Sequence, residues 1–419
     1  MNEQRATNLD DVWINFDPYT PLTANSDFYV ERPGKPLLDL RRALLRSRRL
    51  SRPPKYYLSG HRGAGKSTEM NRLAMDEDIR DQFIVIHYSI RDFSDVNDLD
   101  QVDVLFTIGA QLFLQYTDKE KGYGKKLPKE LLDELEGMRG QITSRLRMTN
   151  KELSAQGEAG LRAYFLNVLL KSKQEEVSRR EIRQELQPSI TDWLRQVNLI
   201  AAAITTQEGK PPLVMIDDLD KPPFKTAKTI FHEYATLLEQ PAFPIVYTVP
   251  IAVFFTREFV TISQGRQFLP SIKLFERKNP NRRWEAGFHT MRQFALKRMD
   301  VNLIEMEALD EAAKLSGGVM RDMARLIQLA VDHALNNGRS KIVAEDVARS
   351  ASELRSDFRR MLSGEDIEVL RHVRSSQELT NPEQLAPLLY ISAAIEYVND
   401  ESWVDVHPIV LPLLEQSDE

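Results

Sequence analysis

The sequence predicts an α/β fold in which a parallel sheet is flanked by helices. Three observations predict it. Short apolar segments rich in β-branched residues alternate with helical patterns as far as about residue 278. A glycine-rich turn at 60–65 stands between one such strand and a helix. The apolar run 213–216 ends in carboxylates, at the kind of strand end where open α/β sheets collect their functional side chains.

The spacing of apolar residues places the individual elements. The first 25 residues are polar and rich in turn residues, so we expect an arm with little regular structure. Residues 119–207 are charged and largely helical in pattern, which predicts a helical insertion. The expected strands are 56–58, 84–88, 213–216, 245–249 and 272–275. The expected helices before the insertion are 36–50, 67–75 and 99–116.

The second part of the chain has a different pattern. After Trp284 it is helical as far as Leu362. Two strand-like segments, 394–398 and 403–406, then flank Asn399-Asp400. A polar pair of this kind favours a tight turn, so we expect a β-hairpin in the acidic tail.

Composition excludes several classes of protein. The chain of 419 residues is 42% hydrophobic and 28% charged, which is typical of a globular protein and excludes disorder as its main state. It contains no cysteine, so disulfides, thiolate metal sites and cysteine nucleophiles are excluded. No apolar run reaches the roughly 18 residues of a membrane span, and residues 1–19 lack a signal-peptide pattern. We therefore expect a cytoplasmic protein without membrane contact.

The net charge of −6 is unevenly distributed. Residues 364–419 contain twelve acids against Arg371 and Arg374, a local charge of −10, so the rest of the chain carries about +4. Residues 41–55 hold seven basic residues and no acid, and a second basic stretch is 273–298. Contacts to nucleic-acid phosphates need Lys and Arg, so the acidic tail favours a protein partner. If DNA is bound, we expect it at one of the two basic stretches.

Residues 60–67 form the most specific motif in the chain. They fit the pattern G-x-x-x-x-G-K-[ST] of a phosphate-binding loop (P-loop), after a predicted strand and before a predicted helix. Glycines let backbone N–H groups surround a phosphate, the lysine adds a charge for the β- and γ-phosphates, and the final hydroxyl binds Mg²⁺. ATP and Mg²⁺ are the expected cofactors. The expected binding residues are Gly60, His61, Arg62, Gly63, Ala64, Gly65, Lys66, Ser67 and Thr68, with Lys66 also catalytic and Ser67 on the metal.

A P-loop also needs a carboxylate partner for its metal, and the strand 213–216 ends in three. Asp217 stands at the strand tip, where we expect it to hold Mg²⁺ through a water molecule. Asp218 follows and is placed to orient or deprotonate the attacking water. Asp220 shares one of these roles or caps the next helix. A buried strand followed by acids is common in α/β proteins, and the pairing with the P-loop is what indicates ATP hydrolysis.

The P-loop paired with the strand end Ile-Asp-Asp-Leu-Asp resembles the AAA+/STAND superfamily of P-loop ATPases, in its KAP-like and origin-recognition-like branches. Those branches often carry Asp where other AAA+ proteins have a catalytic glutamate, and Asp218 stands at that position. The resemblance covers about 28–118 and 208–412. It implies the fold of a P-loop nucleoside triphosphatase with a lid domain.

The resemblance also implies further residues at the nucleotide. Residues 28–32 are similar to the segment that packs on adenine in these families, which assigns Val30 to the nucleotide. Residues 315–322 resemble the lid-helix motif whose sensor-2 arginine, here Arg321, reaches the γ-phosphate and takes part in catalysis. Thr248 occupies the sensor-1 position at the end of the fourth expected strand. His61 lies at a variable position of the loop and is expected to be incidental.

The resemblance divides the chain into four expected parts. An N-terminal arm (1–27) precedes the ATPase core (28–280), which contains the insertion 119–207. A helical lid (281–362) and an acidic winged-helix-like domain (363–419) follow. The family offers no role for the insertion.

AAA+ proteins also place an arginine finger after the sensor strand, where it enters the site of a neighbouring subunit and stabilises charge on the transferring phosphate. The resemblance therefore implies a homo-oligomer. Spacing does not select among the candidates, which are Arg257, Arg266, Arg282 and Arg283.

Three functions remain open. The favoured one is a molecular switch that binds and slowly hydrolyses ATP and changes its assembly state or domain packing to control a partner. The resemblance suggests bacterial antiviral defence as its setting. The alternatives are a DNA-acting AAA+ ATPase of initiator or target-selector type, and a scaffold that binds nucleotide without hydrolysing it. The scaffold is disfavoured because Lys66, Ser67, Asp217 and Asp218 are all present.

Overall fold

The computed structural model describes residues 3–50, 52–145, 157–262, 265–379, 382–398 and 401–415. Its internal contacts divide the chain into two compact units, which we call the sheet unit and the lid unit. The sheet unit comprises Asp39–Leu58 and Leu73–Gln267, and the lid unit comprises Met1–Leu38, Ser59–Arg72 and Phe268–Glu419. The glycine-rich loop therefore belongs to the lid unit, whereas the acids after residue 216 belong to the sheet unit.

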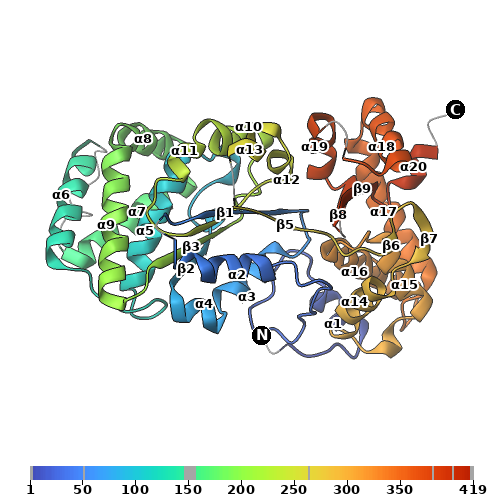
Figure 1. Ribbon diagram of the computed structural model, residues 1–419. Coiled ribbons are helices and arrows are strands. Elements are labelled where there is room, and N and C mark those ends of the chain that lie inside the picture. The colour runs from blue at the N-terminus through green and yellow to red at the C-terminus, as the bar shows by residue number, and fades with distance from the viewer. Residues whose placement is uncertain are drawn as a thin grey trace. The chain divides into compact units, whose positions relative to one another are not determined.

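A five-stranded sheet forms the centre of the sheet unit (Figure 1). Its order is β2-β3-β4-β1-β5, and β2, β3, β4 and β1 pair in parallel. The strands are β1 (Lys55–Gly60), β2 (Ile84–Ser89), β3 (Pro212–Asp217), β4 (Ile245–Thr248) and β5 (Gly265–Leu269). The predicted parallel sheet is confirmed.

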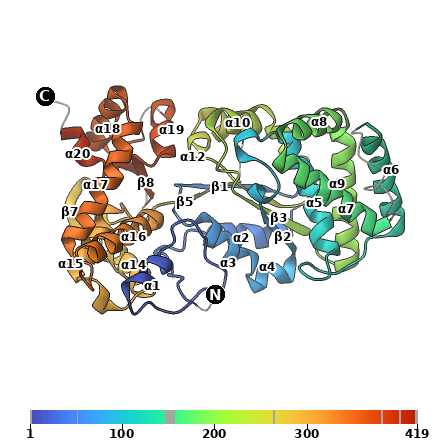
Figure 2. The same cartoon turned by 180° about the vertical axis from the view of Figure 1, so that it is seen from behind.

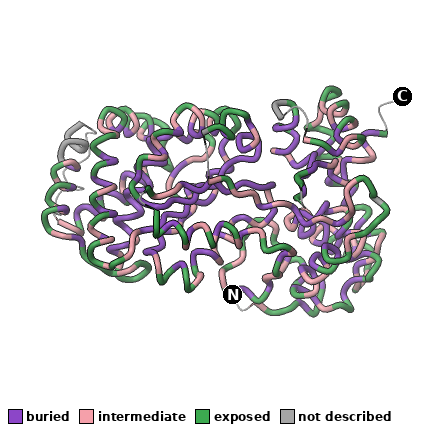
Figure 3. The backbone as a smooth tube through the Cα atoms, in the orientation of Figure 1, coloured by how far each residue is buried: buried purple, intermediate pink, exposed green. Residues whose placement is uncertain are grey.

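Helices lie on both faces of this sheet (Figures 1 and 2). One face carries α2 (Leu38–Ser47) and α4 (Glu77–Gln82), and the other carries α10 (Phe224–Lys228), α11 (Ala235–Leu238), α12 (Ile251–Phe254) and α13 (Arg257–Ile262). β1, β3 and β4 are consequently buried along their whole length (Figure 3), as expected of a parallel sheet with both faces covered. Short helical turns are η1 (Ile90–Asp92), η2 (Val96–Asp98), η3 (Gln187–Ser189), η4 (Thr229–Glu233) and η5 (Val301–Leu303).

The predicted insertion is a group of helices that packs on α5 (Gln101–Thr117). Its helices are α6 (Lys129–Arg145), α7 (Gly157–Gln174), α8 (Glu176–Leu186) and α9 (Ile190–Glu208). The ring of Trp193 stacks on Phe106 with centroids 5.0 Å apart, and its indole Nε1 donates to the Leu105 carbonyl at 2.9 Å. Ion pairs of Arg183 with Asp98 (3.0 Å) and Asp103 (2.6 Å) add a polar attachment. The insertion is thus an integral part of the sheet unit.

The lid unit contains a bundle of four helices after the sheet, as the pattern after Trp284 predicts. They are α14 (Glu285–Leu296), α15 (Met306–Leu315), α16 (Met320–Asn336) and α17 (Ala344–Met361). The expectation of an arm with little regular structure is wrong. Helix α1 (Leu9–Asn15) begins there, capped by the Asn8 side chain, which accepts the Asp11 N–H at 2.9 Å. Leu9 and Val12 on one face of α1, and Phe16 at its C-cap, enter the core of the bundle.

The expected strand at 272–275 is also wrong. The fifth strand is β5, and Ile272 and Leu274 enter the core of the lid bundle instead. The Ile272 N–H donates to the Gly318 carbonyl at 3.1 Å, and the Leu274 carbonyl accepts the Trp284 N–H at 2.8 Å. A small hairpin of β6 (Phe275–Glu276) and β7 (Asn279–Arg283) follows, which the sequence does not predict. An apolar pattern indicates that a segment is buried. It does not indicate whether the segment is buried in the sheet or in the core of the lid bundle.

The C-terminal part of the lid unit has the order helix, helix, hairpin, helix, in agreement with a winged-helix-like domain. Its elements are α18 (Gly364–Ser376), α19 (Pro382–Tyr390), β8 (Ala394–Val398), β9 (Ser402–Val406) and α20 (Leu411–Glu415). The predicted hairpin is confirmed, with Tyr397 opposite Trp403. The turn predicted at Asn399-Asp400 lies outside the described residues. Among the helices that are described, none is both long and apolar enough to cross a membrane.

Candidate nucleotide-binding site

The loop 60–67 has the conformation that its glycines predict. It joins the end of β1 to helix α3 (Lys66–Ala74). Gly63 has a φ of +84°, and a side chain there would place its Cβ 2.3 Å from the Cβ of Arg321. Gly60 has a φ of +155°, and a Cβ there would lie 2.4 Å from the Leu269 carbonyl oxygen. Both positions therefore require glycine for conformation and for space.

Lys66 begins α3 and is buried. Its Nζ donates to the carbonyls of Gly60 (2.8 Å) and His61 (3.0 Å), so the ammonium group is held against the loop itself. Ser67 follows within the first turn of the helix. Thr68, the last residue expected at the nucleotide, uses its hydroxyl to accept the Leu22 N–H at 3.1 Å, which ties the arm to the loop helix.

Arg321, for which the resemblance implies a contact with the γ-phosphate, lies against the P-loop. It stands in the first turn of α16, its backbone N–H donates to the Gly63 carbonyl at 3.2 Å, and its Nε donates to the Pro18 carbonyl at 3.0 Å. The residues Gly63 and Arg321 are 258 positions apart in the chain. Arg321 and the apex of the loop are thus neighbours within the lid unit.

A second arginine reaches the loop and is absent from the residues expected from sequence. Arg32 is buried, and its Nη1 donates to the Ala64 carbonyl at 2.7 Å while its Nη2 donates to the Pro270 carbonyl. Burial lowers the pKa of Arg32 to about 10, which still leaves the guanidinium charged at neutral pH. The only sequence signal for this residue is its place in the segment 28–32. A cation held at an anion-binding loop is suited to phosphate.

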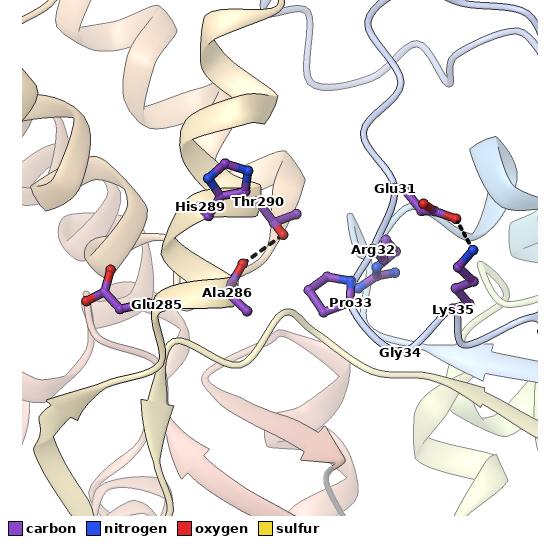
Figure 4. A pocket seen from close by; sticks show the side chains of 9 residues that line it. All are labelled: Glu31, Arg32, Pro33, Gly34, Lys35, Glu285, Ala286, His289 and Thr290. Atoms are coloured by element: carbon purple, nitrogen blue, oxygen red, sulfur yellow. Dashed lines mark hydrogen bonds and ion pairs between the residues drawn. The ribbon is translucent and has the colours of Figure 1, made fainter.

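A pocket of about 570 Å³ adjoins Arg32 (Figure 4). One wall is the backbone turn of residues 31–35, closed by an ion pair of 2.8 Å between Glu31 and Lys35. The other wall is the start of α14, with His289 and Thr290. Val30, expected at adenine, does not line this pocket and packs on the core of the lid bundle. The residues that follow Val30 line this pocket, among them Arg32, whose guanidinium also contacts the Ala64 carbonyl of the loop.

The acids at the end of β3 form a compact cluster in the sheet unit. Oxygens of Asp217, Asp218 and Asp220 all lie within 4.8 Å of one another. Asp217 and Asp220 are buried, and the Asp218 N–H donates to the Asp217 carboxylate at 2.8 Å. Asp218 has a φ of +63°, a left-handed conformation that is rare for a residue with a side chain. Such conformations collect at functional sites.

Two hydroxyl groups hold this acidic turn. Ser89, at the end of β2, donates to the Asp218 carboxylate at 2.7 Å. Thr248, at the end of β4, accepts the Leu219 N–H at 2.9 Å and donates to the Ile216 carbonyl at 3.2 Å. The proposed sensor-1 residue therefore contacts the backbone on both sides of Asp217 and Asp218. Ser89 has no motif in the sequence and is visible only from the pairing of β2 with β3.

Strand order explains why these groups gather at one edge. β4 lies between β1 and β3, with Leu58 opposite Thr248 and Ile216 opposite Tyr247. In parallel strands the carboxyl ends share one edge of the sheet. The carboxyl ends of β2, β3 and β4 thus bring Ser89, the aspartates and Thr248 to one edge of the sheet.

The four candidate finger residues are all exposed. Arg283 forms an ion pair with Asp310 at 3.0 Å, and the Arg266 guanidinium lies 5.8 Å from the Phe254 ring centroid. Arg257 begins α13 and Arg282 lies in β7.

No protein-family model and no curated protein matches the chain. Solved structures match over nearly its whole length. Cdc6p from Pyrobaculum aerophilum is 11% identical, with 97% of this chain and 98% of that chain covered and a TM-score of 0.41. The ORC1 protein of Aeropyrum pernix in complex with DNA is 11% identical, with 97% and 96% covered and a TM-score of 0.42. A Walker-type ATPase of Pyrococcus abyssi is 16% identical, with 96% and 99% covered and a TM-score of 0.38.

These proteins include members of the origin-recognition-like branch that the motifs of this chain resemble.

Proposed function

We propose that the protein is a Mg²⁺-dependent ATPase of the AAA+ type, in which ATP binding and hydrolysis change domain packing or assembly. One observation carries the proposal. A P-loop that holds the Lys66 ammonium group at the carbonyls of Gly60 and His61, and the Arg32 guanidinium at the carbonyl of Ala64, occurs in a chain whose sheet ends in a cluster of three aspartates. Cations at the loop and acids at the strand end are the two halves that phosphoryl transfer to water needs.

The residues present fit a magnesium nucleotide. Backbone N–H groups of the loop and the Lys66 ammonium group would bind the β- and γ-phosphates, and Arg321 would neutralise charge on the γ-phosphate. Ser67 and Asp217 would hold Mg²⁺, which prefers oxygen ligands. The bound ion would supply charge compensation between the β- and γ-phosphates.

Asp218 is the proposed general base. Its carboxylate is fixed at one oxygen by the Ser89 hydroxyl, and its backbone is fixed through Thr248 and Leu219. A base held in one geometry accelerates proton transfer because little reorganisation precedes the reaction. The same set of residues argues against a scaffold that binds nucleotide without turnover.

DNA is a second candidate partner. The two basic stretches, 41–55 and 273–298, differ in how many of their cations are exposed and without an acidic partner. In 273–298 most cations are neutralised or buried: Lys273 pairs with Glu276, Arg277 with Glu401, Arg283 and Arg292 with Asp310, and Arg298 is buried. In 41–55, Arg41 and Arg52 pair with acids, whereas Arg46, Arg48 and Arg49 are exposed at the end of α2 and have no ion pair among the described residues. We therefore propose Arg46, Arg48 and Arg49 as the DNA contact.

The protein partner of the acidic tail and a role in antiviral defence remain predictions from sequence. Two measurements test the proposed function. Phosphate release from Mg·ATP by the purified chain tests the ATPase. Binding of a labelled duplex at 50 and 200 mM salt, by the wild type and by the variant R46Q/R48Q/R49Q, tests DNA. An affinity that falls with salt and is reduced in the variant supports the contact, and equal affinities contradict it.

A further inference from the structure

The variable positions of the P-loop carry contacts that ATP binding does not explain. The Nε2 of His61 accepts the backbone N–H of Glu396, in strand β8, at 2.7 Å. The guanidinium of Arg62 lies 4.0 Å from the ring centroid of Tyr390, at the end of α19, and donates to its hydroxyl. Two consecutive loop residues thus contact two elements of the C-terminal domain (residues 363–415). All four residues belong to the lid unit.

The hydrogen bond to His61 requires a neutral imidazole. His61 is fully buried, and burial, together with the charge of Lys66, lowers its pKa to about 3. Nε2 therefore stays an acceptor at neutral pH, and the hydrogen bond to β8 is maintained.

The same hairpin also contacts the turn that leads to Arg321. The Tyr397 hydroxyl donates to the Gly317 carbonyl at 2.8 Å, and Val319 joins Ile395, Tyr397 and Trp403 in one buried apolar cluster (Figure 1 shows β8 beside α16). A Cβ at Gly317, which has a φ of +58°, would lie 2.4 Å from Ile395 Cδ1. The strand β8 thus touches both the loop and the turn before α16.

We propose that the C-terminal domain controls the nucleotide site of its own chain by holding Arg62 on Tyr390 and His61 on β8, and that triphosphate binding weakens this hold. The inference rests on the proposed function, because it assigns a regulator to that same site. It adds Tyr390 and the β8–β9 hairpin to the groups that determine nucleotide affinity.

Triphosphate binding weakens the contact because the phosphates and Tyr390 compete for the guanidinium of Arg62. Tyr390 offers Arg62 an uncharged hydroxyl and the face of a ring. A triphosphate in the loop offers anionic oxygens, and hydrogen bonds to ionised acceptors are roughly twice as strong as neutral ones. Arg62 adjoins the glycine-rich apex, so phosphate draws it away from Tyr390. Coupling between two sites is reciprocal, so loss of the Tyr390 contact must raise triphosphate affinity.

Release of the hairpin would also explain how nucleotide changes what the protein binds. Ile395, Tyr397 and Trp403 are buried in the docked arrangement. Their exposure would create a contiguous apolar patch of the kind that marks protein contacts. ATP binding at the loop would thus change which side chains the C-terminal domain exposes on its surface.

Hydrogen exchange of the full chain, with and without a non-hydrolysable ATP analogue and Mg²⁺, tests the proposal. We expect the analogue to accelerate exchange in β8 and β9 several-fold. The variant Tyr390→Ala should show accelerated exchange without nucleotide and several-fold tighter binding of the analogue in calorimetry. His61→Ala, which removes the acceptor of the Glu396 N–H on the loop, should also accelerate exchange in β8. Tyr234→Ala, a change at a similarly half-buried tyrosine of the sheet unit, is the matched control and should have neither effect.

Three outcomes separate the two claims. If the wild type binds the analogue and exchange in β8 and β9 is unchanged, the control by the C-terminal domain is wrong and the proposed function stands. If Tyr390→Ala and His61→Ala leave both exchange and affinity unchanged, the control is again wrong. If the folded wild type binds no nucleotide, the proposed function and the inference both fail. Tyr390→Phe, which keeps the ring and removes the hydroxyl, should give a smaller change in both readouts if the proposal holds.

Discussion

The backbone N–H of Arg321 donates to the carbonyl of Gly63 at 3.2 Å, which brings the start of a lid helix onto the apex of the P-loop. The contact is so close that Gly63 has no space for a side chain. A displacement of α16 would therefore move the loop, and a change in the loop would move α16. This relationship makes the lid responsive to whatever the loop binds.

Replacement of Lys66 by Ala should weaken ATP binding, because the phosphates lose a charged contact in a partly dehydrated loop. Lost hydrogen bonds to charged groups cost about 1.5–3 kcal/mol, which corresponds to roughly ten- to a hundred-fold in affinity. Calorimetric titration with Mg·ATP measures this. Unchanged affinity would show that the loop does not bind phosphate.

Ser89→Ala should lower kcat roughly ten-fold and leave KM unchanged, because Asp218 loses the hydroxyl that fixes one of its carboxylate oxygens. Ser89→Thr retains a hydroxyl and is the matched control, with activity near that of the wild type. Steady-state kinetics of phosphate release measure both constants. A large rise in KM with kcat intact would mean that Ser89 serves binding and not the orientation of Asp218.

Arg32→Met should reduce ATP affinity, because the cation at Ala64 is lost together with its hydrogen bonds to the carbonyls of Ala64 and Pro270. Arg32→Lys keeps the charge and should restore part of the affinity. The ratio of ATP affinity to adenosine affinity distinguishes charge from structure. It should fall about ten-fold in Arg32→Met if the cation acts on phosphate. A parallel loss for ATP and adenosine would assign Arg32 a structural role only.

Glu396 should make the stability of the lid unit pH-dependent. Burial raises the pKa of this carboxyl from 4.5 to about 8. Between these two values the folded chain binds more protons than the unfolded chain, so the free energy of unfolding falls as pH rises. The stabilisation is complete below pH ~4.5 and is lost as pH rises through about 8, an effect on the order of a few kcal/mol.

Urea unfolding of the full chain at pH 6 and pH 8.5 measures this dependence. Glu396→Gln removes the titrating group, so its unfolding free energy should vary less between the two pH values than that of the wild type. An identical dependence in both proteins would exclude Glu396 as its source.

Local sequence patterns predict the sheet and the P-loop because contiguous residues determine the structure of each strand and of the loop. The run 213–216 is apolar throughout because β3 is buried on both faces, and the glycines of 60–65 are required by the loop itself. Helix α1 escapes prediction because it is short and because the exposed apolar residues Trp13 and Ile14 obscure the buried face of Leu9 and Val12. The prediction of a strand at 272–275 is wrong for a different reason. The apolar residues of this segment are buried in the core of the lid bundle and not in the sheet.

The groups that surround the loop could not be predicted in the same way. Arg32, Arg321 and Tyr390 reach residues 60–65 from three distant parts of the chain, and such meetings depend on tertiary structure. Arg321 and Arg32 lie in segments that resemble a known family, but the resemblance singles out Arg321 alone, and Tyr390 has no such signal. The charge of the acidic tail is evident from sequence, whereas the contact of Tyr390 with Arg62 is not.

The most direct test of the central claim is the rate of phosphate release from Mg·ATP by the wild type and by Asp218→Asn, together with the ATP affinity of each. The amide keeps a hydrogen-bonding group at the site but cannot accept a proton. We predict that the wild type hydrolyses ATP and that Asp218→Asn binds it with similar affinity and hydrolyses it about a hundred-fold more slowly. Hydrolysis by Asp218→Asn at the wild-type rate, or none by the wild type, would contradict the account.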